Sequence, residues 1–314
     1  MTQPTLKSVF VLTGATATGK TAVAHILAAQ MDAALLSADA MLVYQGLDLG
    51  TAKPPAAERA RFRYGGIDEV SPDQGFSVGA YRDCALAFLE SVPAEQPVIL
   101  VGGTGLYIKA LLYGLDAMPP TDPALRAEIE ALYAAEGLAA LQAACRACDP
   151  ARYAALKDVH NPRRVMRALE LARMGVPLQA VWTEPTAQVP RFPGLTLDRT
   201  TLLQRIQTRV ETMYAQGLLD EVAALQRQWP EWSGTAAQAI GYREARAVLE
   251  GATDPTTARA ETVRRTRQYA RRQETWLRNQ FDVDWIDVDA YDPEQTAALV
   301  SASWKRYGPC PITS

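Results

Sequence analysis

Short, uniformly apolar runs alternate with helix-forming segments in the first third of the chain. The runs cover residues 9–13, 33–36 and 98–101, and the segment 22–31 has helix-forming composition. A strand that is apolar throughout is buried on both faces, and its alternation with helices is typical of a parallel sheet. The pattern therefore predicts an α/β protein whose parallel sheet is covered by helices on both faces.

Residues 118–177 change to a helical pattern. Asp122-Pro123 and Asn161-Pro162 each resemble a helix N-cap followed by proline at the first helical position. Gly175 and Pro177 end the second of these helices. The segment has the character of an insertion with a small core of its own.

The helix that starts after Asn161 is amphipathic. Val165, Leu169 and Ala172 share one face, whereas Arg163 and Arg167 lie four residues apart on another. The apolar face is expected to pack inside the insertion, and the arginine face is left for solvent or a partner.

The rest of the chain returns to mixed elements. They are expected to be a loop over 183–193, strands over 195–197 and 283–289, and helices over 202–229 and 236–280. The sequence thus predicts two domains. One is a core formed by residues 1–117 and 195–314, with a helical C-terminal part, and the other is a helical insertion domain over residues 118–194.

The segment GATATGKT, which we call the phosphate loop, fits the pattern G-x-x-x-x-G-K-[ST]. It follows an expected strand and precedes an expected helix, so its backbone N–H groups and the helix N-terminus can face phosphate oxygens. Lys20 adds a mobile charge, and the Thr21 hydroxyl suits a Mg²⁺ ion. The expected phosphate contacts are Gly14, Ala15, Thr16, Ala17, Thr18, Gly19, Lys20 and Thr21. The core is therefore expected to resemble the P-loop NTPase fold.

The kind of phosphate is not fixed by the loop. ATP or GTP chemistry normally places an acidic Mg²⁺ ligand at the end of a neighbouring strand. The run 98–101 ends in Gly102-Gly103-Thr104 without a carboxylate, although Asp39, after the run 33–36, could take that part. A diphosphate leaving group needs the same cradle but no activated water, so both alternatives stay open.

Three candidate groups follow strand ends: the phosphate loop, Asp39 and Thr104. Ligands of parallel α/β sheets bind at the carboxyl ends of the strands. We therefore expect these groups on one rim of the sheet.

The amino-acid composition excludes few classes of protein. Hydrophobic residues make up 48% and charged residues 21%, as in ordinary globular proteins. No apolar run approaches the ~20 residues that span a bilayer, and no secretory signal is visible. Four cysteines without a disulfide-like pattern fit a reducing cytoplasm. Cys145 and Cys148 lack a second pair, so no zinc site is expected. We expect a cytoplasmic monomer without membrane association.

The charge distribution is more informative than the net charge of -3. Between Arg259 and Arg278 the chain carries seven arginines against Glu261 and Glu274 alone. Attraction to a nucleic-acid backbone depends on such a local patch. A solvated helix face is the alternative, and charge patterning leaves both open.

Together with the phosphate loop, six further segments resemble bacterial tRNA dimethylallyltransferases in order and spacing. They are SADAMLVYQGLDLGTAKP (37–54), VGGTGLYIKALLYGL (101–115), DPALR (122–126), NPRRVMRALE (161–170), AIGYREA (239–245) and TRQYARRQETWLR (266–278). Each is weak evidence alone, but the set covers almost the whole chain.

The resemblance implies a reaction. The phosphate loop would hold the diphosphate of dimethylallyl diphosphate with Mg²⁺, without consuming ATP. Asp39 would be the general base for the N6 amino group of adenosine 37, and Thr104 would bind at the reaction centre. Arg209, or alternatively Arg205, would help to hold the diphosphate.

The resemblance also implies contacts with the tRNA anticodon stem-loop. The residues concerned are Asp39, Ala40, Met41, Leu42, Thr104, Arg126, Arg163, Arg164, Val165, Met166 and Arg167. Many relatives have serine and glutamine where this chain has Ala40 and Leu42, so fewer base-edge contacts are expected there. The histidine-containing stretch of relatives is replaced by residues 63–68.

The chemistry agrees with these roles. An exocyclic adenine amine is a weak nucleophile, so a carboxylate must take its proton as the C–N bond forms. The allylic carbon tolerates positive charge, and cationic groups must neutralise the leaving diphosphate. A kinase or NTPase, a prenyl transferase acting on free AMP, and a non-catalytic tRNA-binding protein are the alternatives. An enzyme acting on free AMP would not need the helical insertion and the arginine-rich segment. A protein that only binds tRNA would not need the phosphate loop.

Overall fold

The structure, a computed structural model, describes residues 7–115, 119, 122–178 and 189–312. The chain divides into two compact units. Unit 1 comprises Met1–Gly114 and Glu184–Ser314, and unit 2 comprises Leu115–Thr183. Within the described residues, no helix has the length and hydrophobicity needed to cross a bilayer.

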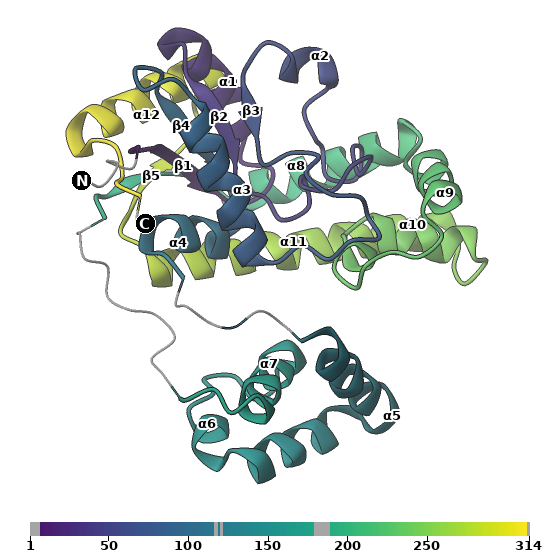
Figure 1. The fold of residues 1–314 in the computed structure, drawn as a ribbon. Helices are drawn as coiled ribbons and strands as arrows, with labels where there is room; N and C mark the ends of the chain where they lie inside the picture. Colours follow the sequence, from purple (N-terminus) through teal and green to yellow (C-terminus); the bar gives the residue numbers. More distant parts are fainter. Residues whose placement is uncertain (1–6, 116–118, 120–121, 179–188, 313–314) are drawn as a thin grey trace. The chain divides into compact units, whose positions relative to one another are not determined.

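Unit 1 is built on one sheet of six strands in the order β3-β2-β4-β1-β5-β6 (Figure 1). The strands are β1 (Phe10–Gly14), β2 (Ala34–Ser37), β3 (Tyr64–Gly65), β4 (Val98–Gly102), β5 (Phe192–Thr196) and β6 (Val283–Asp287). All neighbouring strands pair in parallel. The predicted parallel α/β sheet is confirmed.

Alternate residues of each central strand face two different hydrophobic cores, which explains why the runs are apolar throughout. Leu12, Leu35 and Ile99 join a core with α1 (Lys20–Met31) and α12 (Pro293–Tyr307). Their strand neighbours, such as Val11 and Leu36, join a larger core on the other face. That face is covered by α3 (Val78–Ser91), α4 (Gly105–Tyr113) and the end of α11 (Pro255–Gln280).

The remaining helices of unit 1 follow β5 or lie in loops. They are α2 (Ala56–Arg59), α8 (Arg199–Ala215), α9 (Leu218–Gln228), η1 (Ala236–Gln238) and α10 (Tyr242–Leu249). A separate small core joins α8 and α11 to the phosphate loop through Ala15, Ile206, Val210, Val263 and Ala270. These two helices are thus packed directly against the predicted ligand site.

Unit 2 contains α5 (Pro123–Cys148), α6 (Pro150–Ala154) and α7 (Pro162–Arg173) around a core of its own. Asp122 and Asn161 cap the first free N–H groups of α5 and α7, as predicted from their Asp-Pro and Asn-Pro pairs. Gly137, with φ of 77°, breaks α5 into two helical pieces.

Several boundaries differ from the prediction, and the helices expected over 202–229 and 236–280 are each divided into shorter ones. The expected loop over 183–193 ends earlier, because Phe192 and Pro193 already belong to β5 and pair with β6; residues 183–188 of it lie outside the described residues. On the β1 side proline is tolerated, because β5 pairs with β1 only from Gly194 onward and no β1 partner needs an N–H at Pro193. The last strand stops at Asp287.

Candidate active site

The phosphate loop forms a tight turn between β1 and α1. Its backbone is left-handed at Ala17 (φ 67°) and Gly19 (φ 91°). A side chain on Gly14 would place its Cβ only 2.5 Å from the carbonyl oxygen of Leu195, so a glycine is required where β1 meets β5. The Thr18 hydroxyl closes the turn by donating to the carbonyl oxygen of Ala15 at 2.9 Å.

Lys20 folds back over this turn. Its Nζ donates to the carbonyl oxygen of Ala15 at 2.6 Å. Burial lowers the pKa of Lys20 to about 8; nearby Asp39 acts in the opposite direction, and Arg209 lowers it further. The amine therefore keeps its charge less firmly than a solvated lysine, and an anionic ligand in the turn would offset that loss. The side chain of Thr21, the next residue, is exposed.

Two arginines of α8 reach the phosphate loop. Arg209 donates from Nη1 to the Thr16 hydroxyl at 3.2 Å and from Nη2 to the carbonyl oxygen of Thr51 at 2.9 Å. Arg205, one turn earlier, is exposed, and its Nη1 lies 3.8 Å from the place where a Cβ on Gly19 would be. Arg209 is the fixed and more buried of the two, which favours it for holding a diphosphate.

Asp39 and Thr104 lie at the ends of β2 and β4 and are tied together. Thr104 donates its N–H to the carbonyl oxygen of Ala38 at 3.0 Å, and its hydroxyl accepts from the N–H of Ala40 at 3.0 Å. The Asp39 carboxylate accepts from the N–H of Met41 at 2.9 Å. The Asp39 carboxylate also influences the pKa of Lys20 and of Arg209, which places it within electrostatic reach of the phosphate loop.

Gly102 and Gly103 allow the three strand ends to approach one another. A Cβ on Gly102 would lie 2.2 Å from the carbonyl oxygen of Ala38, and one on Gly103 would lie 2.8 Å from that of Gly14. Only residues without a side chain fit between these backbones. The phosphate loop, Asp39 and Thr104 therefore meet on one rim, as the strand ends predicted.

Sequence reasoning missed two residues of α11 at this rim. Gln273 accepts from the N–H of Thr16 at 2.8 Å, so it ties the phosphate loop to α11. Tyr269 is hydrogen-bonded to Thr104, and burial together with the Asp39 carboxylate raises the pKa of its hydroxyl. The sequence does contain a pattern that could have identified them. One helix face carries a residue every four positions, at Tyr269, Gln273 and Leu277.

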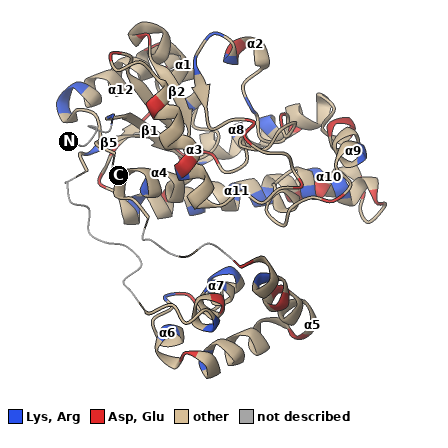
Figure 2. Cartoon of the chain, viewed as in Figure 1, with Lys and Arg blue, Asp and Glu red and all other residues tan. Residues whose placement is uncertain are grey.

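The arginines of α11 are divided between internal contacts and solvent. Arg264, Arg265 and Arg278 pair with Glu261, Glu244 and Glu274. Others, such as Arg267 and Arg271, are exposed on the same helix, whose arginines are blue in Figure 2. Part of this cluster is therefore structural, and the exposed remainder fits a polyanionic partner.

The predicted RNA contacts fall into two groups. In unit 1, Ala40, Met41 and Leu42 follow Asp39 directly and are half-buried. In unit 2, Arg163 and Arg164 are exposed at the start of α7. These residues are accessible to a partner.

Other predicted RNA contacts in unit 2 are engaged internally. Val165 is fully buried and Met166 is 6% exposed, so their side chains belong to the core of unit 2, where α7 packs its apolar face. Arg167 donates to buried Glu170 at 2.9 Å and to the carbonyl oxygen of Pro119 at 2.7 Å. Arg126 pairs with Glu130. Any RNA contact of Val165 or Met166 would have to use the backbone.

The fold and this rim define an α/β protein with a P-loop NTPase-like core, in which the Asp39 carboxylate lies within electrostatic reach of the phosphate loop. The family model described as IPP transferase matches residues 42–280. The chain belongs to this family, which confirms the resemblance found in the sequence.

Individual relatives agree. The tRNA dimethylallyltransferase of Stenotrophomonas maltophilia (strain R551-3) is 42% identical over 306 residues, which cover 92% of this chain and 94% of the relative. That of Chromohalobacter salexigens is 39% identical, over 93% of this chain and 96% of its own.

Solved structures show the same fold. The crystal structure of the tRNA isopentenylpyrophosphate transferase from Bacillus halodurans superposes with a TM-score of 0.68 at 31% identity, covering 96% of this chain and 97% of that one. A eukaryotic dimethylallyltransferase acting on tRNA gives a TM-score of 0.71 at 20% identity, covering 98% of this chain and 81% of that one. The second likeness concerns the fold alone.

Proposed function

We propose that this protein transfers a dimethylallyl group from dimethylallyl diphosphate to N6 of adenosine 37 in tRNA and releases diphosphate. The observation that carries the proposal is that Asp39, Thr104 and the phosphate loop share one rim, where Gly102 and Gly103 bring the strand ends together and Asp39 lies within electrostatic reach of Lys20 and Arg209. An acceptor amine at Asp39 and a diphosphate in the loop would then lie on opposite sides of a five-carbon unit. The relatives are named tRNA dimethylallyltransferases, which supports the transfer of a dimethylallyl group to tRNA.

In the proposed reaction the phosphate loop, Lys20 and Arg209 bind the diphosphate. The bond between the allylic carbon and the diphosphate oxygen breaks, and its electron pair leaves on that oxygen, where these cations and backbone N–H groups stabilise it. The N6 lone pair forms the new C–N bond, and the N6 proton passes to the Asp39 carboxylate. Thr104, held by Tyr269 and by the backbone of Ala40, would orient the acceptor.

Mg²⁺ fits this site as an ion shared with the substrate. Within the described ranges, no three or more His, Cys, Asp or Glu side chains are grouped to hold a metal by themselves. Mg²⁺ commonly takes few protein ligands and completes its shell with water and substrate phosphates. The exposed Thr21 hydroxyl at the start of α1 would hold it, and the ion would neutralise charge on the diphosphate.

The tRNA substrate accounts for the rest of the chain. Unit 2 would be the insertion that contacts the anticodon stem-loop, with the exposed Arg163 and Arg164 as phosphate contacts. The target base must leave its stack, which costs a few kcal/mol that such contacts offset. We expect the protein to act on tRNA in the cytoplasm as a monomer.

Incubation with unmodified tRNA, Mg²⁺ and dimethylallyl diphosphate labelled in the allyl group is expected to transfer label to the RNA. Nuclease digestion and mass spectrometry should place the group on one adenosine, next to the anticodon. Parallel reactions contain AMP in place of tRNA, or ATP alone. Equal transfer to AMP, or ATP hydrolysis without labelled RNA, would overturn the proposal in favour of its rivals.

A second test addresses unit 2. The double substitution Arg163→Ala and Arg164→Ala is expected to weaken tRNA binding about tenfold and to lower the salt dependence of binding by about one to two charges, since phosphate contacts release counterions. Turnover at saturating tRNA should change little. Arg173→Ala, an exposed arginine at the other end of α7, is the matched control. Equal losses in both proteins would argue against a specific contact.

A further inference from the structure

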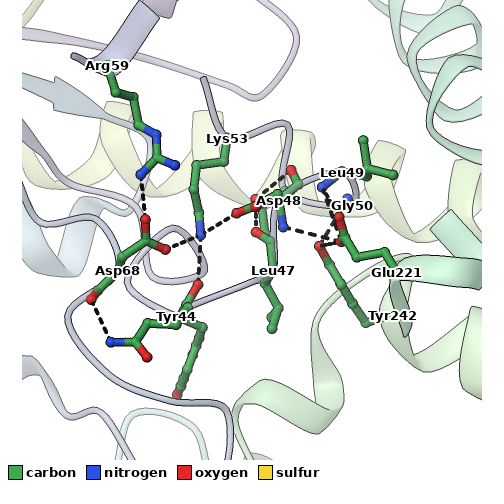
Figure 3. A network of polar contacts seen from close by, with 12 residues as sticks. Tyr44, Leu47, Asp48, Leu49, Gly50, Lys53, Arg59, Asp68, Glu221 and Tyr242 are labelled. Atoms are coloured by element: carbon green, nitrogen blue, oxygen red, sulfur yellow. Dashed lines mark hydrogen bonds and ion pairs between the residues drawn. The ribbon is translucent and has the colours of Figure 1, made fainter. Parts of the chain in front are cut away.

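The loop after β2 is held by a network of polar contacts (Figure 3). Glu221, from α9, accepts from the N–H groups of Leu49 at 2.9 Å and Asp48 at 3.2 Å. The Tyr242 hydroxyl donates to Glu221 at 2.5 Å and accepts from the N–H of Gly50 at 3.1 Å. Three consecutive backbone N–H groups are thus captured by two side chains of distant helices.

The packing around this loop leaves it little freedom. Tyr242 is fully buried, and a Cβ on Gly50 would lie 2.3 Å from its ring, so the loop packs closely against the ring. Burial raises the pKa of Glu221, while its hydrogen bonds from Tyr242 and the loop oppose this rise. Removing a carboxylate from water is costly unless hydrogen bonds compensate for the lost hydration. Here most of the compensating hydrogen bonds come from the backbone of one loop.

The far end of the same loop is anchored as well. Lys53 is 7% exposed, and its Nζ donates to the carbonyl oxygen of Tyr44 at 2.8 Å. It also pairs with Asp48 at 2.8 Å and with Asp68 at 2.6 Å, and Asp68 pairs with Arg59. Residues 48–53 are therefore fixed at both ends.

The fixed loop presents one acceptor to the proposed diphosphate site. The carbonyl oxygen of Thr51, directly after the captured N–H groups, accepts from Nη2 of Arg209 at 2.9 Å. The other end of that guanidinium donates to Thr16 in the phosphate loop at 3.2 Å. The two bonds fix the guanidinium plane, and one of them depends on where residues 48–51 lie.

We infer that Glu221 and Tyr242 are positioning residues for the diphosphate site: they hold residues 48–50 so that the Thr51 carbonyl aims Arg209 at the phosphate loop. The inference rests on the proposed function for the identity of the ligand. The contacts themselves do not depend on it. Without the loop in place, the half-buried guanidinium of Arg209 would lose a hydrogen-bond acceptor and its fixed orientation.

The test uses the full-length protein and inorganic diphosphate with Mg²⁺ as the probe, measured by calorimetry. Glu221→Gln and Tyr242→Phe are each expected to weaken diphosphate binding about tenfold, the loss associated with one charge-assisted hydrogen bond of Arg209. The KM for dimethylallyl diphosphate should rise in parallel, while the KM for tRNA stays within about twofold, because the RNA surface is untouched. Glu250→Gln, an exposed carboxylate directly after α10, is the control and should match the wild type.

A double-mutant cycle separates positioning from general stability. If Glu221 acts through Arg209, Glu221→Gln combined with Arg209→Ala should bind diphosphate no more weakly than Arg209→Ala alone. Additive losses, or wild-type affinity in both single variants, would overturn the inference. If Glu221→Gln fails to fold, the result for Tyr242→Phe decides the question, because that substitution removes only a hydroxyl. A wild-type protein that binds diphosphate but transfers nothing to tRNA would refute the proposed function alone.

Discussion

Asp39→Asn is expected to slow dimethylallyl transfer to tRNA by about 10²–10⁴-fold, the range that a positioned general base contributes. Asparagine has nearly the same shape and can still accept the N–H of Met41, which Asp39 binds at 2.9 Å. It cannot take a proton from N6 as the C–N bond forms. Single-turnover kinetics with bound tRNA and saturating donor would measure the chemical step directly.

The same variant should leave binding largely intact. Affinity for tRNA and for diphosphate is expected to stay within about threefold of the wild type, because the lost function belongs to the transition state. Asp83→Asn, at an exposed position of α3, is the control for a generic loss of negative charge. If tRNA affinity fell as far as turnover, Asp39 would be a binding residue and its role as the base would be wrong.

Lys20→Ala is expected to cause the second large loss, about 10²–10³-fold in turnover, comparable to removing one preorganised oxyanion donor. The amine already lies in the turn, bonded to the Ala15 carbonyl at 2.6 Å, so it needs little rearrangement to meet a phosphate. Diphosphate affinity should fall together with turnover, whereas tRNA affinity should not. Calorimetry with inorganic diphosphate and filter binding with tRNA distinguish the two. Loss of tRNA affinity with intact diphosphate binding would contradict this role.

The pKa of Lys20 adds a pH dependence to this prediction. Because burial lowers its pKa to about 8, the amine of the ligand-free protein is charged below that pH and becomes neutral as the pH rises through it. The advantage of the wild type over Lys20→Ala in diphosphate affinity should therefore be largest at about pH 7 and shrink toward about pH 9. Comparison with the variant removes the titration of diphosphate itself. A constant advantage across this range would show that Lys20 does not titrate there.

Much of the fold follows from local pattern. Apolar runs such as 98–101 identify strands with a core on each face, and Asp-Pro and Asn-Pro identify helix starts, because both signals depend on neighbouring residues. The spacing of Val165 and Leu169 already placed Val165 on the apolar face of α7, and the structure buries it there. The family resemblance predicted that Val165 contacts RNA. Its buried side chain conflicts with that prediction.

By itself the sequence determined the parallel sheet, the phosphate loop with its glycines, and the rim on which Asp39 and Thr104 lie, since each follows from local residue pattern and from the carboxyl ends of parallel strands meeting at one edge. Only the tertiary structure decided which groups complete the rim. Gln273 reaches Thr16 across 257 positions, and Arg209 finds the carbonyl of Thr51 across 158. A backbone carbonyl has no sequence signature, and partners so distant in the chain meet only through the packing of α8, α9, α10 and α11 around the loops.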